Sequence, residues 1–97
     1  MSVLTAVQEL DECYSPDLPA AAKAELLVDI ERASRRLEAL RCRVIGDFDA
    51  EGGASLDGSA STAAWLRNHC QLTPADAHGR VRTARALRAL ASSLTRV

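Results

Sequence analysis

Three carboxylates near the middle of the chain have the spacing of metal ligands. Asp47, Asp49 and Glu51 alternate and are followed directly by a glycine, as at the start of a calcium-binding loop. The twelfth position of such a loop requires a bidentate glutamate, and Gly58 stands there instead. The segment is also expected to begin inside a helix. We therefore interpret these carboxylates as a solvated helix end, and the sequence predicts no metal site and no cofactor.

The histidines His69 and His78 and the three cysteines are further residue types that can bind metal ions. His69 and Cys70 are neighbours, and neighbouring side chains on a helix point about 100° apart, so they do not easily face one ion. Cys13, Cys42 and Cys70 are odd in number and form no CxxC pair, which predicts reduced thiols. We expect Cys42 and Cys70 to be small buried hydrophobes. Since no Ser-His-Asp set or phosphate loop is present, the chain is not predicted to be an enzyme.

Arginines near the C-terminus could contact a polyanion. Arg82, Arg85, Arg88 and Arg96 fall on one broad face of a predicted helix. Residues 58–97 contain six arginines and one acid, whereas residues 1–57 contain twelve acids and six basic residues. Arginines can bind phosphates or guanines of duplex DNA. Alternatively, the basic face is solvated or pairs with the acidic second helix. The pI of about 6.1 lies below the value above ~9 typical of dedicated nucleic-acid-binding domains.

Apolar spacing and capping residues predict an all-α fold. We expect one domain (residues 1–97): a small helical bundle with one long central helix and a C-terminal hairpin resembling a helix-turn-helix. The helices are predicted at 1–14, 19–51, 62–70 and 74–97, with a glycine-rich loop at 52–61. Ser2 suits the first N-cap, and Thr73 followed by Pro74 suits the start of the last helix. The residues of the last helix expected to point inward are Ala77, Val81, Ala84, Leu87, Ala91 and Leu94.

The long predicted helix carries a narrow, coiled-coil-like row of apolar residues. This interaction stripe consists of Leu26, Ile30, Leu37, Leu40, Val44 and Phe48, with Ala33 completing the spacing. Burying one large side chain contributes about 2 kcal/mol, whereas ordering each residue costs about 1.5 kcal/mol, so the helix needs a partner. We expect self-association, or packing against a missing C-terminal portion. The last helix has no stop signal, which is expected of a fragment or a truncated copy.

Most of the chain resembles the 13E12 repeat family, an actinobacterial group built on a domain of unknown function. The resemblance is carried by DGSASTAAWL at 57–66, LTPADA at 72–77 and ARAL at 84–87. It implies a helical N-terminal region, with an HNH endonuclease domain downstream in many members. The HNH motif is absent from this sequence, so no catalytic residue is carried over. Ala60 and Gln71 stand where the family commonly has a basic residue and a glycine.

The sequence supports two functional hypotheses. The first is a non-catalytic N-terminal module of an HNH-endonuclease-like protein, assisting binding to duplex DNA through the four arginines named above. The alternative is a protein-interaction or dimerisation module, or a truncated remnant with no independent activity. No small-molecule substrate is evident, and no apolar run approaches the ~18 residues that span a membrane. Since no signal peptide is evident either, a cytoplasmic location is expected.

Overall fold

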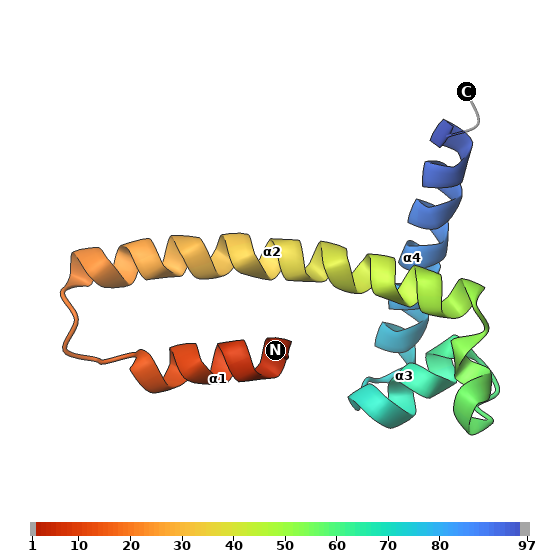
Figure 1. Cartoon of the computed structure of the whole chain (residues 1–97), viewed down its shortest axis with the longest axis horizontal. Coiled ribbons are helices and arrows are strands. Elements are labelled where there is room, and N and C mark those ends of the chain that lie inside the picture. Colours follow the sequence, from red (N-terminus) through yellow and green to blue (C-terminus); the bar gives the residue numbers. More distant parts are fainter. Residues whose placement is uncertain (1, 96–97) are drawn as a thin grey trace. The chain divides into compact units, whose positions relative to one another are not determined.

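The protein has an all-α fold, as the sequence predicts (Figure 1). The computed structural model describes residues 2–95, and this part of the chain contains no strand. Its four α-helices are α1 (Val3–Cys13), α2 (Ala20–Ala50), α3 (Thr62–Cys70) and α4 (Pro74–Thr95). The bounds lie within a few residues of those expected from the capping residues.

The predicted glycine-rich loop is partly helical. A 3-10 helix, η1 (Gly53–Asp57), occupies its first half, which corrects the expectation of an irregular loop at 52–61. Gly52 and Gly58 flank η1 with φ angles of 71° and 77°, a left-handed conformation that glycine adopts without steric cost. The Ser55 hydroxyl donates to the Gly52 carbonyl at 2.8 Å. Glycine therefore turns the chain at both ends of one short helix.

The chain divides into two compact units, Met1–Ala33 and Ser34–Val97, and α2 contributes residues to both. In the first unit, the Thr5 amide donates to the Ser2 hydroxyl at 3.0 Å, which confirms the predicted N-cap. Lys23 donates from Nζ to the Pro16 carbonyl at 2.7 Å and so ties the turn before α2 to its first residues. None of residues 2–33 is buried. This unit contains no core of its own.

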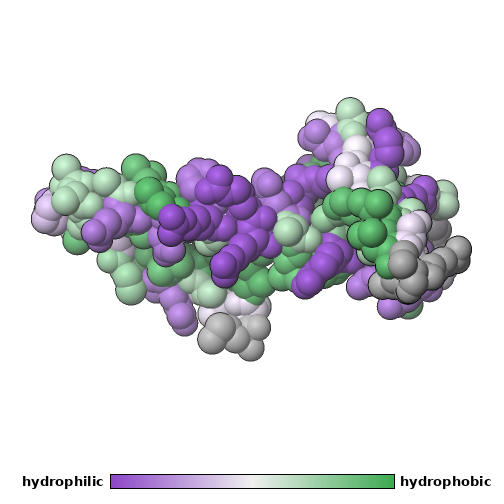
Figure 2. Space-filling model, turned by 90° about the horizontal axis from the view of Figure 1, so that it is seen from above, coloured by the Kyte–Doolittle hydropathy of each residue, from purple (hydrophilic) through white to green (hydrophobic). Residues whose placement is uncertain are grey.

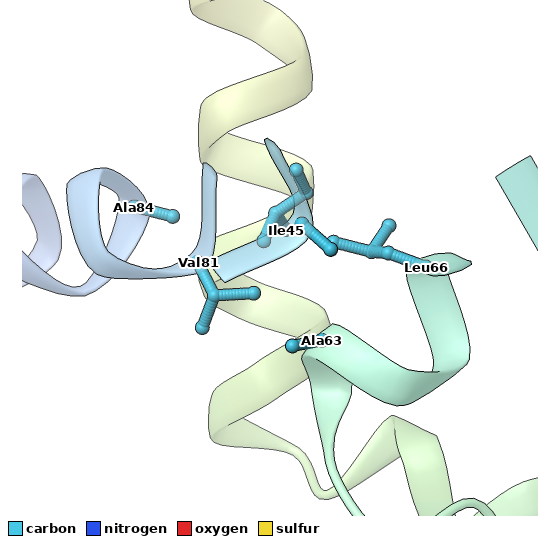
Figure 3. Close-up of a cluster of buried hydrophobic side chains, with 6 residues drawn as sticks. Ile45, Ala63, Leu66, Val81 and Ala84 are labelled. Carbon is cyan, nitrogen blue, oxygen red and sulfur yellow. The ribbon is translucent and has the colours of Figure 1, made fainter. Parts of the chain in front are cut away.

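The second unit contains the hydrophobic core (Figure 3). α2 contributes Ile45, and α3 and α4 contribute small or medium side chains on one face of each helix: Ala63, Leu66, Ala77, Val81 and Ala84. Small residues allow α2 and α4 to approach closely. A Cβ atom built on Gly46 would lie 3.5 Å from the Ala84 carbonyl oxygen.

Only the first half of the predicted inward face of α4 is buried. Ala77, Val81 and Ala84 belong to the core, but Leu87 and Leu94 are 51% and 67% exposed, and Ala91 is exposed as well. The expectation that α4 is covered along its whole length is wrong for these residues, because the core of the second unit ends near Ala84. Periodicity identifies an apolar face but does not say how far a neighbouring element covers it.

No helix within residues 2–95 has the length and hydropathy needed to cross a membrane.

Candidate interaction surfaces

The interaction stripe of α2 is mostly uncovered. Ile30, Leu37, Leu40 and Val44 are between 41 and 56% exposed, whereas Leu26 is half-buried. Figure 2 shows apolar surface (green) exposed among the hydrophilic surface (purple). Burial of aliphatic side chains contributes most of the favourable free energy of folding and association, so an exposed row of them is a candidate binding surface.

Phe48, the last residue of the stripe, is less exposed than Ile30, Leu37, Leu40 and Val44. Its ring centroid lies 4.7 Å from that of Trp65, and the Phe48 side chain is half-buried. A Cβ atom on Gly53 would collide with the Phe48 ring, so the glycine makes room for this aromatic pair. Phe48 therefore stabilises the second unit, and the free part of the stripe ends at Val44.

Sequence reasoning missed the face of α2 that packs against the core. This face consists of Cys42, Ile45, Gly46 and Asp49, of which Ile45 and Gly46 are buried. Its spacing of three, one and three residues is helical. The small residue Gly46 beside Ile45 indicates a face for close helix packing. The longer apolar stripe was the more regular pattern, so this second face was not predicted. α2 thus carries two apolar faces in its second half, and one of them is occupied within the chain.

Two of the predicted DNA-contacting arginines are bound to carboxylates of α2. Arg85 donates from Nε and Nη2 to the two carboxylate oxygens of Asp49, both at 2.8 Å, and Thr62 donates its hydroxyl to Asp49 at 2.6 Å. Arg88 forms an ion pair with Asp47. The alternative in which the basic face pairs with the acidic second helix is the arrangement found for Arg85 and Arg88.

The Arg85–Asp49 contact has a marked electrostatic effect. The hydrogen bonds from Arg85, and then that from Thr62, lower the pKa of Asp49 from 3.8 to about 2. The same carboxylate raises the pKa of Arg85. The Asp49 side chain is only 17% exposed, whereas Arg85 is 61% exposed and the pair is therefore screened by solvent on one side.

The remaining predicted arginines are placed differently. Arg82 is exposed and borders a shallow pocket that Ser61, His78 and Arg85 also line. Arg96 lies outside the described residues. Of the four arginines, Arg82 is the one whose guanidinium the structure leaves exposed without an ion pair in the described part of the chain.

The turn between α3 and α4 contains a non-glycine residue with a positive φ angle. Gln71 adopts φ 54° and ψ 42°, which is left-handed and is favoured by glycine over other residues. The Asp76 amide then donates to the Thr73 hydroxyl at 3.2 Å, the N-cap bond predicted for α4. The hairpin therefore tolerates a strained residue at its turn.

A second polar cluster links η1 to α3. Asp57 accepts the Ser59 hydroxyl at 2.6 Å and lies 2.5 Å from His69 Nε2. The hydrogen bonds from Ser59 and His69 lower the pKa of Asp57 to about 2. The His69 ring stacks on Trp65 with a centroid distance of 4.4 Å. The sequence did not indicate this cluster, because its members are separated by a loop whose path was unknown.

The cysteines differ from one another in burial. Cys42 is half-buried against the core, in keeping with its expected role, but Cys70 is exposed, which corrects the expectation of a buried thiol. Cys70 is the last residue of α3, and the core contacts near it are made by Leu66 and Leu72 instead. Residues 2–95 contain no group of three or more His, Cys, Asp or Glu side chains that could hold a metal ion.

A shallow concavity lies between α2 and α4. It has a volume of about 470 Å³, and its rim carries two acidic and two basic residues: Glu38, Arg41, Asp76 and Arg80. Cys42 and Ile45 contribute apolar lining. The rim charges cancel, so this groove has no electrostatic preference for an anion or a cation.

The fold and the surfaces define an all-α protein in which one long helix presents an uncovered apolar stripe. The sequence of residues 24–97 matches the family described as a domain of unknown function, DUF222. The chain belongs to this family. The match includes all of α3 and α4 and most of α2, but not α1. The chain has no match among curated proteins or among solved structures.

Proposed function

We propose that the chain is a non-catalytic helical interaction module that self-associates through the interaction stripe of α2. The supporting observation is that Ile30, Leu37 and Leu40 are each more than 40% exposed, while none of residues 2–33 is buried. Helices in such a unit do not persist without tertiary contacts. A second copy would provide those contacts.

The free energy of burying the side chains of the stripe predicts a dimer of moderate affinity. Covering the exposed half of a large aliphatic side chain contributes about 1 kcal/mol, so four residues from each of two copies contribute roughly 8 kcal/mol. Association itself costs about 4–15 kcal/mol, so this contribution is sufficient only with further contacts around the stripe. One charged substitution in the stripe should therefore dissociate the dimer.

Sedimentation velocity of the purified chain tests the proposal. The wild-type protein is expected to be dimeric, and Leu37→Asp is expected to be monomeric at the same concentration. Leu56→Asp is the matched control, because Leu56 is 84% exposed in η1 and lies outside the stripe. A wild-type protein that stays monomeric at about 100 µM, where a complex with a dissociation constant of about 10 µM is mostly dimeric, would refute self-association of moderate affinity.

A second candidate function is contact with duplex DNA, which the α3–turn–α4 hairpin and the exposed Arg82 favour. In a helix-turn-helix the second helix enters the major groove, and α4 corresponds to that helix. As part of this candidate, the module would act beside an HNH nuclease in the cytoplasm, a role that the resemblance to 13E12 repeat proteins supports. The ion pairs of Arg85 and Arg88 reduce the positive charge that α4 offers.

Duplex affinity measured across a salt series tests the second candidate. Each phosphate contact made by an arginine changes the slope of log K against log salt by about one, so Arg82→Ala should weaken binding and reduce the slope by that amount. Arg32→Ala is the control, since Arg32 is an exposed arginine on the other unit. Absence of salt-dependent binding at micromolar protein would eliminate DNA as a partner.

A further inference from the structure

The two compact units carry opposite formal charge. Met1–Ala33 contains seven acidic and two basic residues, a net charge of −5, and Ser34–Val97 contains six acidic and ten basic residues, a net charge of +4. α1 alone has three acids and no basic residue, whereas α4 has one acid and four arginines. Two copies that join like unit to like unit would therefore repel each other, and copies that join unlike units would attract.

The interaction stripe follows a heptad repeat up to Val44. The residues at its a and d positions are Leu26, Ile30, Ala33, Leu37, Leu40 and Val44. In an antiparallel pair of helices an a residue packs against a d residue. One register matches every member of this row with another: Leu26 with Val44, Ile30 with Leu40, and Ala33 with Leu37. No shift by a heptad in either direction pairs all six.

Charges beside the stripe distinguish the two possible orientations. Asp29, Arg36 and Arg43 occupy the g positions. In the antiparallel register, two-fold symmetry produces two contacts between Asp29 of one copy and Arg43 of the other. It also brings the two Arg36 residues, one from each copy, opposite each other. A parallel pair instead places Arg36 against Arg41 of the second copy twice. Asp29, Arg36 and Arg43 are all exposed, so their side chains are accessible to a second copy.

We propose that two copies pair antiparallel along α2, so that the acidic Met1–Ala33 of one copy lies against the basic Ser34–Val97 of the other. The inference rests on the proposed self-association and adds its orientation, its register and its electrostatic basis. Each copy provides an acidic and a basic half, so the interface is two-fold symmetric and closed. The same pairing covers the first unit, which has no core within its own chain.

A charge-exchange experiment on the full chain tests the orientation. Asp29→Arg and Arg43→Asp each convert two attractive contacts into two repulsive ones, which is expected to raise the dimer dissociation constant roughly tenfold. An equimolar mixture of the two variants restores attraction at both positions. Native mass spectrometry should show predominantly the heterodimer, with an affinity close to that of the wild-type homodimer. Neither residue is buried, so both variants should retain wild-type helicity by circular dichroism at concentrations where they are dimeric.

The outcomes separate the orientation from self-association itself. A mixture that forms no excess of heterodimer overturns the antiparallel register. If wild type and both charge variants dimerise equally while Leu37→Asp is monomeric, the orientation is wrong and the proposed function stands. If wild type is monomeric throughout, the proposed function fails and the orientation fails with it. A preference for heterodimer combined with dissociation by Leu37→Asp supports both.

Discussion

Asp49 connects three helices of the second unit through one carboxylate. It extends from α2, accepts two hydrogen bonds from Arg85 of α4 and accepts a third from Thr62 at the start of α3. Thr62 is buried, and its hydroxyl would lack a partner without Asp49. The residue that resembled a calcium ligand in sequence is therefore explained by contacts within the chain.

The lowered pKa of Asp49 predicts a pH-dependent stability. Because the folded pKa of about 2 lies below the unbound value of 3.8, the contribution is present above about pH 4 and is lost as the pH falls toward 2. Asp49→Asn should lower the free energy of unfolding at pH 7 by about 1 kcal/mol and differ little from wild type at pH 2. Urea unfolding followed by the fluorescence of Trp65, the single tryptophan, measures this difference. The exposed Glu31→Gln, which lies outside the stripe and its flanking charges, is the control and should show no such convergence.

The left-handed backbone at Gln71 predicts a stabilising substitution. Gln71→Gly removes the steric cost of a positive φ, which outweighs the added freedom of the unfolded chain, so the free energy of unfolding should rise by about 0.5–1 kcal/mol. Gln71→Ala keeps a Cβ atom and should give no such gain. The urea midpoint measures both, and a destabilised glycine variant would contradict the assigned conformation.

α2 combines two faces with different partners. Ile45 and Gly46 pack within the second unit, whereas the stripe from Ile30 to Val44 remains uncovered. Gly46 lowers the helix propensity of α2 by about 1 kcal/mol relative to alanine, and its position against Ala84 accounts for a small residue there. The intrinsic helix stability of α2 is therefore lowest at Gly46, where α2 lies close to α4.

Two substitutions at Gly46 should have opposite effects. Gly46→Ala fits, because its Cβ would lie 3.5 Å from the Ala84 carbonyl oxygen, and should raise the free energy of unfolding by about 0.5–1 kcal/mol. Gly46→Leu should lower it by about 2 kcal/mol, because the longer side chain displaces α4. Thermal unfolding distinguishes them, and equal stability of the two variants would show that α2 and α4 do not approach at this point.

For the whole molecule, the lack of buried residues among residues 2–33 leads us to predict that stability depends on association. A protein that folds by pairing has a melting temperature that rises with concentration. A tenfold increase in concentration should raise the melting temperature of wild type by about 4 °C, since it changes the free energy by about 1.4 kcal/mol. The melting temperature of Leu37→Asp should be independent of concentration. Circular dichroism at 222 nm follows both, and a concentration-independent wild type would contradict pairing.

The amino-acid sequence by itself determined the helical content, the caps at Ser2 and Thr73 and the existence of the apolar stripe on α2. These depend on interactions between residues three or four positions apart, which periodicity records directly. Only the tertiary structure decided that Arg85 binds Asp49, 36 residues away in the chain, that Ile45 rather than Val44 faces the core, and that the cover of α4 ends near Ala84. Such contacts depend on how the helices pack in space. The order of residues along one helix does not specify which residues of another helix lie next to it.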